Sequence, residues 1–143
     1  MVSWMGLVDN SEEVEKRYGE HVPSLAGIDL AEATVHYDGP DATLRFDLPE
    51  LPDYLPSKWK QQGFNTVQLT IVFTGIFEFS IQGWEGDVIA DLWLTEAKSQ
   101  IRAMVRSSTV NLDMVAGSAR LSSLSAYIDS RRSEIDPLYP VKD

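Results

Sequence analysis

Histidine and cysteine carry out much of the catalysis and metal binding in proteins, and this chain has few of them. Its 143 residues include two histidines, His21 and His36, and no cysteine. The histidines stand 15 positions apart, which fits neither the HExxH nor the HxxxH spacing of zinc sites. Without cysteine there can be no disulfide, thiolate metal site or cysteine nucleophile. The spacing therefore predicts no zinc centre.

Serines and carboxylates show no catalytic pattern either. The chain has no G-x-S-x-G motif and its nine glycines are scattered, so neither a serine triad nor a phosphate loop is predicted. Glu85, Asp87 and Asp91 are close in sequence, but the glycines at 83 and 86 are typical of a turn. We interpret these carboxylates as a solvated turn, with weak calcium binding as the alternative. The protein is therefore not expected to be an enzyme or to hold a cofactor or metal ion.

The chain is strongly acidic, with 22 acidic and 12 basic residues and a net charge of −10. Contacts with nucleic-acid phosphates need clustered lysine and arginine, so direct nucleic-acid binding is not expected. An acidic surface attracts basic protein partners instead. No apolar run approaches the roughly 18 residues of a membrane span, and the N-terminus lacks the pattern of a signal peptide. These features predict a soluble protein of the cytoplasm.

Apolar and polar residues alternate from Ile28 onward, and this period of two predicts β-strands. The alternating segments lie at residues 28–37, 44–48, 66–73, 77–82, 88–95, 101–106, 110–114 and 119–128. Segment 88–95 is apolar at nearly every position, which predicts burial on both faces, and segment 119–128 also fits a helical period. The expected fold is mostly β, an antiparallel curved sheet or sandwich of about 7–8 strands, with a C-terminal helical segment as an open alternative.

Two hairpins can be predicted with their register. A loop at Thr74-Gly75-Ile76 would turn the chain back and keep the apolar residues of both strands on one face. The residues then expected to face inward are Leu69, Ile71, Phe73, Phe77, Phe79 and Ile81. A two-residue loop at Ser107-Ser108 would place Arg102 opposite Asp113, and an opposed charge pair supports that register.

Outside the strands we expect one short helix and one long loop. Acidic residues at 12–15 suit the first turn of a helix that Gly19 would end, with Val14 and Tyr18 pinning it to the core. Prolines interrupt residues 49–63, where Tyr54 and Trp59 are expected to pack down. We expect a single domain over residues 1–143, with its core at about 4–129 and an extended tail at 131–143.

Trp93 is the aromatic residue that is hardest to assign to a core. It shares a strand face with Asp91, which is typical of an interface anchor, although cover beneath the N-terminal helix would give the same pattern. If strands 77–82 and 88–95 are hairpin neighbours, one patch forms for a protein partner. That patch consists of Glu78, Glu85, Asp87, Asp91 and Trp93. Tyr54 and Trp59 are the secondary candidates for partner binding.

The order of several short motifs points to a family. A tryptophan near the start and a charged helix are followed by Tyr18-Gly19, Pro23-Ser24-Leu25, Asp29, Glu32, Lys58-Trp59, Asn65-Thr66-Val67-Gln68-Leu69 and Gly83-Trp84. From Trp4 to about Asp129 the chain resembles the immunity protein 50 family of bacterial polymorphic toxin systems. The resemblance implies a small, mostly β, cytoplasmic protein without catalytic residues, which protects the producing cell by binding a cognate toxin domain.

We therefore expect a protein that binds and neutralises a toxin. A basic toxin such as a nuclease fits the acidic charge, because carboxylates can occupy a site built for phosphate. Two other functions stay open. One is a small-ligand carrier with a cavity lined by Phe73, Phe77, Phe79 and Trp84. The other is a structural or assembly domain.

Overall fold

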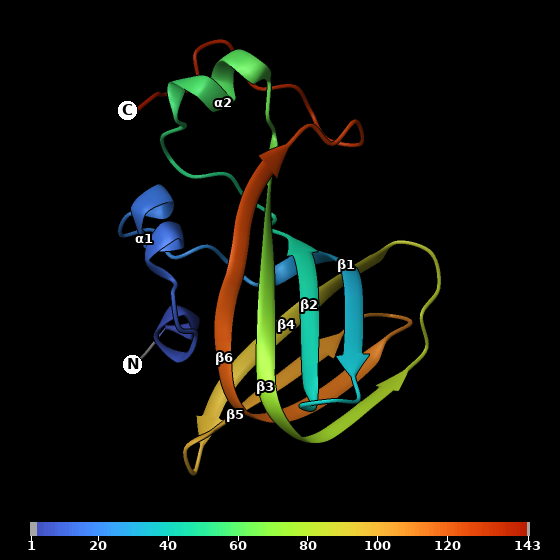
Figure 1. Ribbon diagram of the computed structural model, residues 1–143. Coiled ribbons are helices and arrows are strands. Elements are labelled where there is room, and N and C mark those ends of the chain that lie inside the picture. The colour runs from blue at the N-terminus through green and yellow to red at the C-terminus, as the bar shows by residue number, and fades with distance from the viewer. Residues whose placement is uncertain (1–2, 143) are drawn as a thin grey trace.

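The computed structural model describes residues 3–142, and in this range six antiparallel strands close into a barrel (Figure 1). The strands are β1 (Ala26–His36), β2 (Asp41–Asp47), β3 (Thr66–Gln82), β4 (Val88–Ala97), β5 (Gln100–Arg106) and β6 (Asn111–Tyr127). Their order around the barrel is β1-β2-β3-β6-β5-β4, and pairing of β1 with β4 closes the circle. The mostly β prediction is confirmed, but the sheet is closed and has fewer strands than expected.

Two long strands explain the smaller number. β3 and β6 have 17 residues each, and each contains two of the predicted segments. The hairpin predicted at Thr74-Gly75-Ile76 is wrong, because β3 runs through Gly75, whose φ is +66°. Gly117 of β6 lies beside Gly75, so that both strands bend at one corner of the barrel. The helical alternative for 119–128 is also wrong, since β6 stays extended to Tyr127.

A bulge after this corner changes which residues face inward. The register of β3 against β6 shifts between Ile76 and Glu78, which leaves Phe77 as the extra residue, 64% exposed. Phe79 is half-buried against the core, whereas Ile81 is exposed at the end of the strand. The inward prediction is therefore confirmed for Leu69, Ile71, Phe73 and Phe79 and wrong for Phe77. Ile81 also lies on the inner face, opposite the buried Leu112, but it is 39% exposed near the end of the strand.

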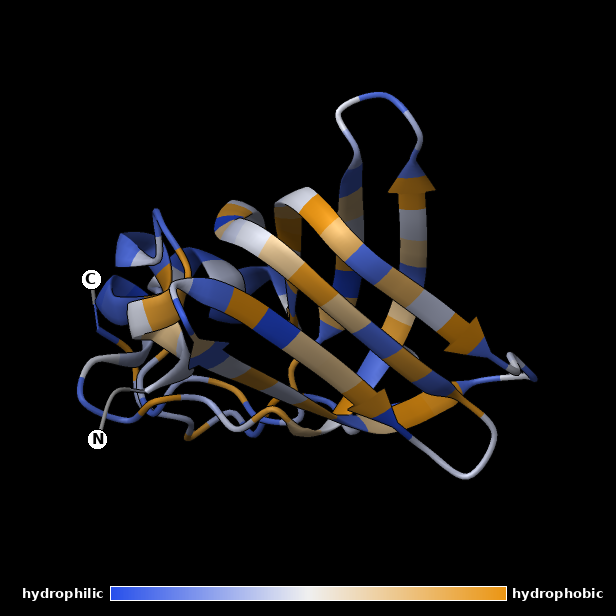
Figure 2. Cartoon of the chain, turned by 90° about the horizontal axis from the view of Figure 1, so that it is seen from below, coloured by the Kyte–Doolittle hydropathy of each residue, from blue (hydrophilic) through white to orange (hydrophobic). Residues whose placement is uncertain are grey.

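The interior of the barrel is filled with side chains. Hydrophobic residues alternate with polar ones along the strands, which Figure 2 shows as orange and blue bands. The largest fully buried side chains on the strands include Ile28, Leu44, Phe46, Leu69, Ile71, Phe73, Leu112 and Met114. Phe77 and Trp84 are exposed while Phe73 is fully buried. The aromatic residues assigned to a carrier cavity thus do not line a common space.

The N-terminal segment packs against the barrel as predicted. It contains the short helix η1 (Trp4–Leu7) and α1 (Glu12–Tyr18), which ends at Gly19 with a φ of +62°. Val14 and Tyr18 are buried, and the Tyr18 hydroxyl donates to the Glu50 carbonyl oxygen at 2.9 Å. Within residues 3–142, no helix is long and apolar enough to cross a membrane.

The long loop and the C-terminal tail hold each other. The loop contains α2 (Ser57–Gln62), and Leu55 is fully buried. Leu55 N–H donates to the Pro140 carbonyl oxygen, and Lys142 N–H donates to the Leu55 carbonyl oxygen, both at 2.9 Å. Trp59 packs against the core as predicted, but Tyr54 is 54% exposed, so the prediction that it packs down is wrong.

The β5–β6 hairpin differs in register from the prediction. Residues 107–110 form a four-residue loop in which Ser107 N–H donates to the Val110 carbonyl oxygen at 3.0 Å. The longer loop shifts the pairing by two residues, so that Arg102 lies opposite Val115. Asp113 instead accepts two hydrogen bonds from Arg106, at 2.9 and 3.0 Å.

The burial of Phe73 and the exposure of Phe77 predict opposite outcomes for one substitution. Phe73→Ala should lower the free energy of unfolding by about 3–5 kcal/mol, because it opens a cavity in the barrel. Phe77→Ala removes the same side chain from the surface and should cost less than about 1 kcal/mol. Urea denaturation of both variants measures this, and equal costs would contradict the bulged register.

Candidate functional site

The outer face of β4 carries two large apolar side chains that solvent reaches. The inward residues of this strand are buried in the barrel: Val88, Ala90, Leu92 and Leu94. On the outer face Ile89 is 58% exposed and Trp93 is 45% exposed. Asp91 lies between them, because residues two apart on a strand share a face at a spacing of ~6.6 Å. Burial of β4 on both faces was thus wrongly predicted, whereas the placement of Trp93 beside Asp91 is confirmed.

The loop that precedes β4 extends this surface. Trp84 is 43% exposed, and Glu85 and Asp87 are exposed as well. Gly83 begins the loop in close contact with the β5–β6 loop, where a β-carbon would lie 2.0 Å from the Thr109 carbonyl oxygen. We call Trp84, Glu85, Asp87, Ile89, Asp91 and Trp93 the β4 surface.

Glu78 does not belong to this surface. The predicted patch required β3 and β4 to be hairpin neighbours, but β3 pairs with β2 and β6, and β4 pairs with β1 and β5. Glu78 lies opposite Val115 of β6, Val115 lies opposite Arg102 of β5, and Arg102 lies opposite Thr95 of β4. The strands β6 and β5 therefore separate Glu78 from Trp93. In the other direction around the closed barrel, β2 and β1 lie between them.

Two carboxylates of the β4 surface also hold the fold in place. Asp91 accepts a hydrogen bond from Gly27 N–H at 2.9 Å, next to the pairing of β1 with β4. Asp87 forms an ion pair with Arg131 at 3.0 Å. The turn carboxylates thus have partners on separate elements and do not converge as calcium ligands do.

Arg131 belongs to a cluster of buried carboxylates that the sequence did not predict. Oxygen atoms of Asp29, Asp47 and Asp129 all lie within 4.8 Å of one another. The Arg131 guanidinium lies 2.7 Å from Asp29 and 2.8 Å from Asp129. Asp47 accepts hydrogen bonds from the Gln68 amide at 2.9 Å and from the Tyr127 hydroxyl. A guanidinium and neutral donors thus satisfy these carboxylates.

The cluster has a structural role that its pairing explains. Asp29 lies directly opposite Asp47 on β1 and β2, and like charges in that position destabilise a sheet. Arg131, which follows β6, brings a positive charge to this pair. Its hydrogen bonds lower the pKa of Asp129 to about 2. Burial, followed by the hydrogen bond to Asp47, raises the pKa of Tyr127 to about 12.

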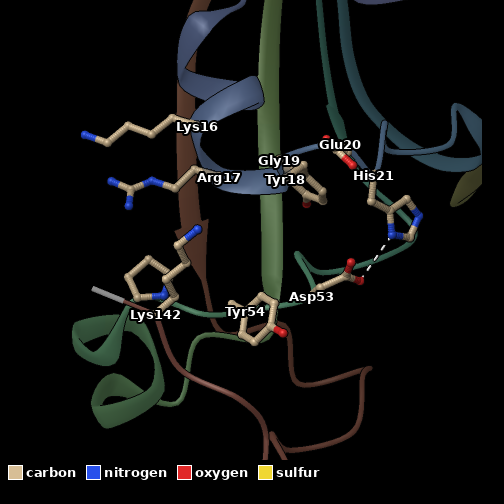
Figure 3. Close-up of a pocket in the computed structure, with 10 residues that line it drawn as sticks. Lys16, Arg17, Tyr18, Gly19, Glu20, His21, Asp53, Tyr54 and Lys142 are labelled. Atoms are coloured by element: carbon tan, nitrogen blue, oxygen red, sulfur yellow. Dashed lines mark hydrogen bonds and ion pairs between the residues drawn. The ribbon is translucent and has the colours of Figure 1, made fainter.

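A second surface feature is a groove between the end of α1 and the tail (Figure 3). Its volume is about 770 Å³, and Lys16, Arg17 and Lys142 form one side. On the other side His21 lies 3.1 Å from Asp53. This contact and a second one with Glu50 raise the pKa of His21.

Tyr54 and Trp59, the secondary candidates for partner binding, differ in their surroundings. Tyr54 lines the groove with its ring exposed. Trp59 instead packs beneath Arg17, whose guanidinium carbon lies 5.2 Å from the centre of the ring. The histidines are not brought together, since His21 precedes β1 and His36 ends that eleven-residue strand. The structure therefore gives two candidate surfaces for a partner and, within residues 3–142, no pair of histidines poised for catalysis.

The lowered pKa of Asp129 predicts how the protein responds to acid. Because the folded-state value of about 2 lies below the ordinary value of 3.8, the charged carboxylate stabilises the fold above pH 4. This contribution is lost as the pH falls from about 4 to about 2. In urea denaturation, Asp129→Asn should be less stable than the parent at pH 7, and the two should converge toward pH 2. Parallel stability curves would contradict the role of this ion pair.

Comparison with known proteins identifies one family. The family model described as immunity protein 50 matches residues 10–127. A search of curated proteins and a search of solved structures gave no match. The matched segment runs from the residues before α1 to the end of β6, and it includes the whole barrel and the β4 surface. The chain belongs to the immunity protein 50 family.

Proposed function

We propose that this protein binds a cognate toxin domain and neutralises it, which protects the bacterium that makes the toxin. Family membership supports the immunity role, and the β4 surface supplies the means of binding. The protein acts in the cytoplasm by covering the toxin and performs no catalysis. The separated histidines and the internally paired carboxylates support this non-enzymatic function.

The observation that carries the proposal is the combination of exposed apolar anchors with carboxylates on one surface. Trp84, Ile89 and Trp93 are large hydrophobic residues that remain substantially exposed. Met104 lies opposite Trp93 on β5 and extends the apolar area. Interface energy concentrates in a few such anchors, tryptophan above all, that become fully desolvated on binding. The β4 surface has this composition.

The charge of the protein defines the partner further. A net charge of −10 accelerates the approach of a basic partner and slows that of an acidic one. Toxins that act on nucleic acids have basic surfaces, because their substrate is a polyanion. Glu85 and Asp87 flank the apolar anchors, where they face such a surface after docking. A basic toxin, such as a nuclease, is therefore the partner that fits best.

Anchors and charges should affect different rate constants. Trp93→Ala removes buried contact area and should mainly increase the dissociation rate, by more than tenfold. Glu85→Gln should mainly lower the association rate and weaken its dependence on salt. Both are measured by surface plasmon resonance at two ionic strengths, with the cognate toxin domain as the immobilised ligand.

Phe77→Ala is the matched control, because it removes an aromatic ring that is even more exposed than Trp93 and lies outside the β4 surface. It should leave both rate constants unchanged. If Trp93→Ala binds like the parent while Phe77→Ala weakens binding, the interface lies on another face of the barrel. If the parent does not bind the domain, the proposed function is wrong.

A further inference from the structure

The groove beside α1 is positively charged on one side, in a protein whose net charge is −10. Three of the twelve basic residues, Lys16, Arg17 and Lys142, line this one hollow. Figure 3 shows their side chains together on one side, with His21 and Asp53 on the other. The helix dipole favours Lys16 and Arg17 in the last turn of α1, but Lys142 brings a third positive charge to them from the tail. Together these cations outnumber the two carboxylates of the lining, Glu20 and Asp53.

The fold fixes the positions of these three cations although they are far apart in sequence. Lys16 and Arg17 occupy the last turn of α1, which Gly19 ends. Lys142 is held by a parallel β-bridge between Leu55 and Val141 and donates its own N–H to Leu55. The groove therefore has a rigid backbone on both sides of its basic wall.

Arg17 is oriented before any partner binds. Its guanidinium lies over the Trp59 ring at 5.2 Å, and one end pairs with Glu13 at 3.3 Å. Stacking on the Trp59 ring fixes the plane of the Arg17 guanidinium. A guanidinium has five N–H donors, and the ion pair with Glu13 does not use all of them. Within residues 3–142, the ammonium groups of Lys16 and Lys142 have no partner for a hydrogen bond or ion pair. All three side chains can thus donate hydrogen bonds to a bound carboxylate.

The rest of the groove suits a polypeptide. Its volume of about 770 Å³ is within the range of small-ligand pockets, roughly 300–1,000 Å³, and because the groove is open at the surface, a chain segment can lie in it. The Tyr54 ring, 54% exposed, offers an apolar contact close to the cations. A peptide that alternates acidic and apolar residues can satisfy both features, whereas a free inorganic anion would leave the ring uncovered.

We propose that this groove binds an acidic segment of the toxin, with its carboxylates on Lys16, Arg17 and Lys142 and an apolar side chain on Tyr54. The proposal rests on the proposed function in that the partner is the toxin. The toxin would then make two contacts, a basic one with the acidic β4 surface and an acidic one with the basic groove. Two contacts of opposite charge fix the orientation of the docked toxin and select against toxins that are basic throughout.

The groove can be tested without the toxin. A blocked peptide of four glutamates around one leucine is titrated into ¹⁵N-labelled protein, and amide shifts are followed by NMR. Shifts should concentrate at residues 16–21, 53–56 and 142. The double variant Lys16→Glu/Lys142→Glu should weaken peptide binding at least tenfold. Arg17 is left unchanged, because its stacking on Trp59 supports the fold.

Lys98→Glu/Arg102→Glu is the control for net charge, because it lowers the charge by the same amount as the groove variant and both residues are exposed outside the groove. It should weaken peptide binding less than threefold. Shifts that spread over the surface, or an equal loss in the control, would overturn the proposal. ATP is titrated in parallel, and groove shifts with ATP but not with the peptide would show a nucleotide site instead.

The toxin then separates this proposal from the proposed function. The double variant should weaken toxin binding at least tenfold, in addition to the effect of Trp93→Ala. Normal toxin binding by the double variant would overturn the groove proposal and leave the immunity function intact. Absence of toxin binding by the parent would overturn the function, while the peptide titration would still report on the groove.

Discussion

Pairing of β1 with β4 closes the barrel, and the placement of the β4 surface depends on this closure. A closed sheet has no exposed edge, and each strand then has one packed face and one outer face. Closure forces Val88 and Leu92 inward and leaves Ile89 and Trp93 on the outside. It also requires β3 and β6 to bend together near Gly75, since two straight strands of 17 residues would leave the barrel.

The C-terminal tail stabilises the outside of the barrel. The segment after β6 carries Arg131 to the opposed pair Asp29 and Asp47, which would otherwise repel each other. Further along, the tail pairs with Leu55 and completes the groove beside α1. Paired elements therefore support both candidate surfaces, and preorganisation of this kind would lower the entropy cost of binding a partner.

Local patterns predicted those features that depend on near neighbours. The extent of α1, the inward direction of Phe73 and the shared outer face of Asp91 and Trp93 each follow from spacing within a few residues. Gly75 could not be assigned in this way, because a positive φ suits both a hairpin and a bend. The pairing with β6, some 40 residues later, decides between them.

The same limit explains the other differences. Ser107 Oγ accepts hydrogen bonds from Thr109 N–H and Val110 N–H, which stabilises a longer loop than the serines alone indicated. Asp29 and Arg131 are 102 residues apart, and only the path of the tail brings them together. Glu78 was assigned to the wrong surface because strand order around a barrel cannot be derived from alternation.

The proposed function depends most on contact between the β4 surface and the toxin. Hydrogen–deuterium exchange of this chain, free and bound to its cognate toxin domain, measures that contact. Binding should slow exchange at residues 83–95 and at the facing part of β5, with little change in the β1–β2 turn at 37–40. Unchanged exchange at 83–95 together with protection of that turn would contradict the proposed contact.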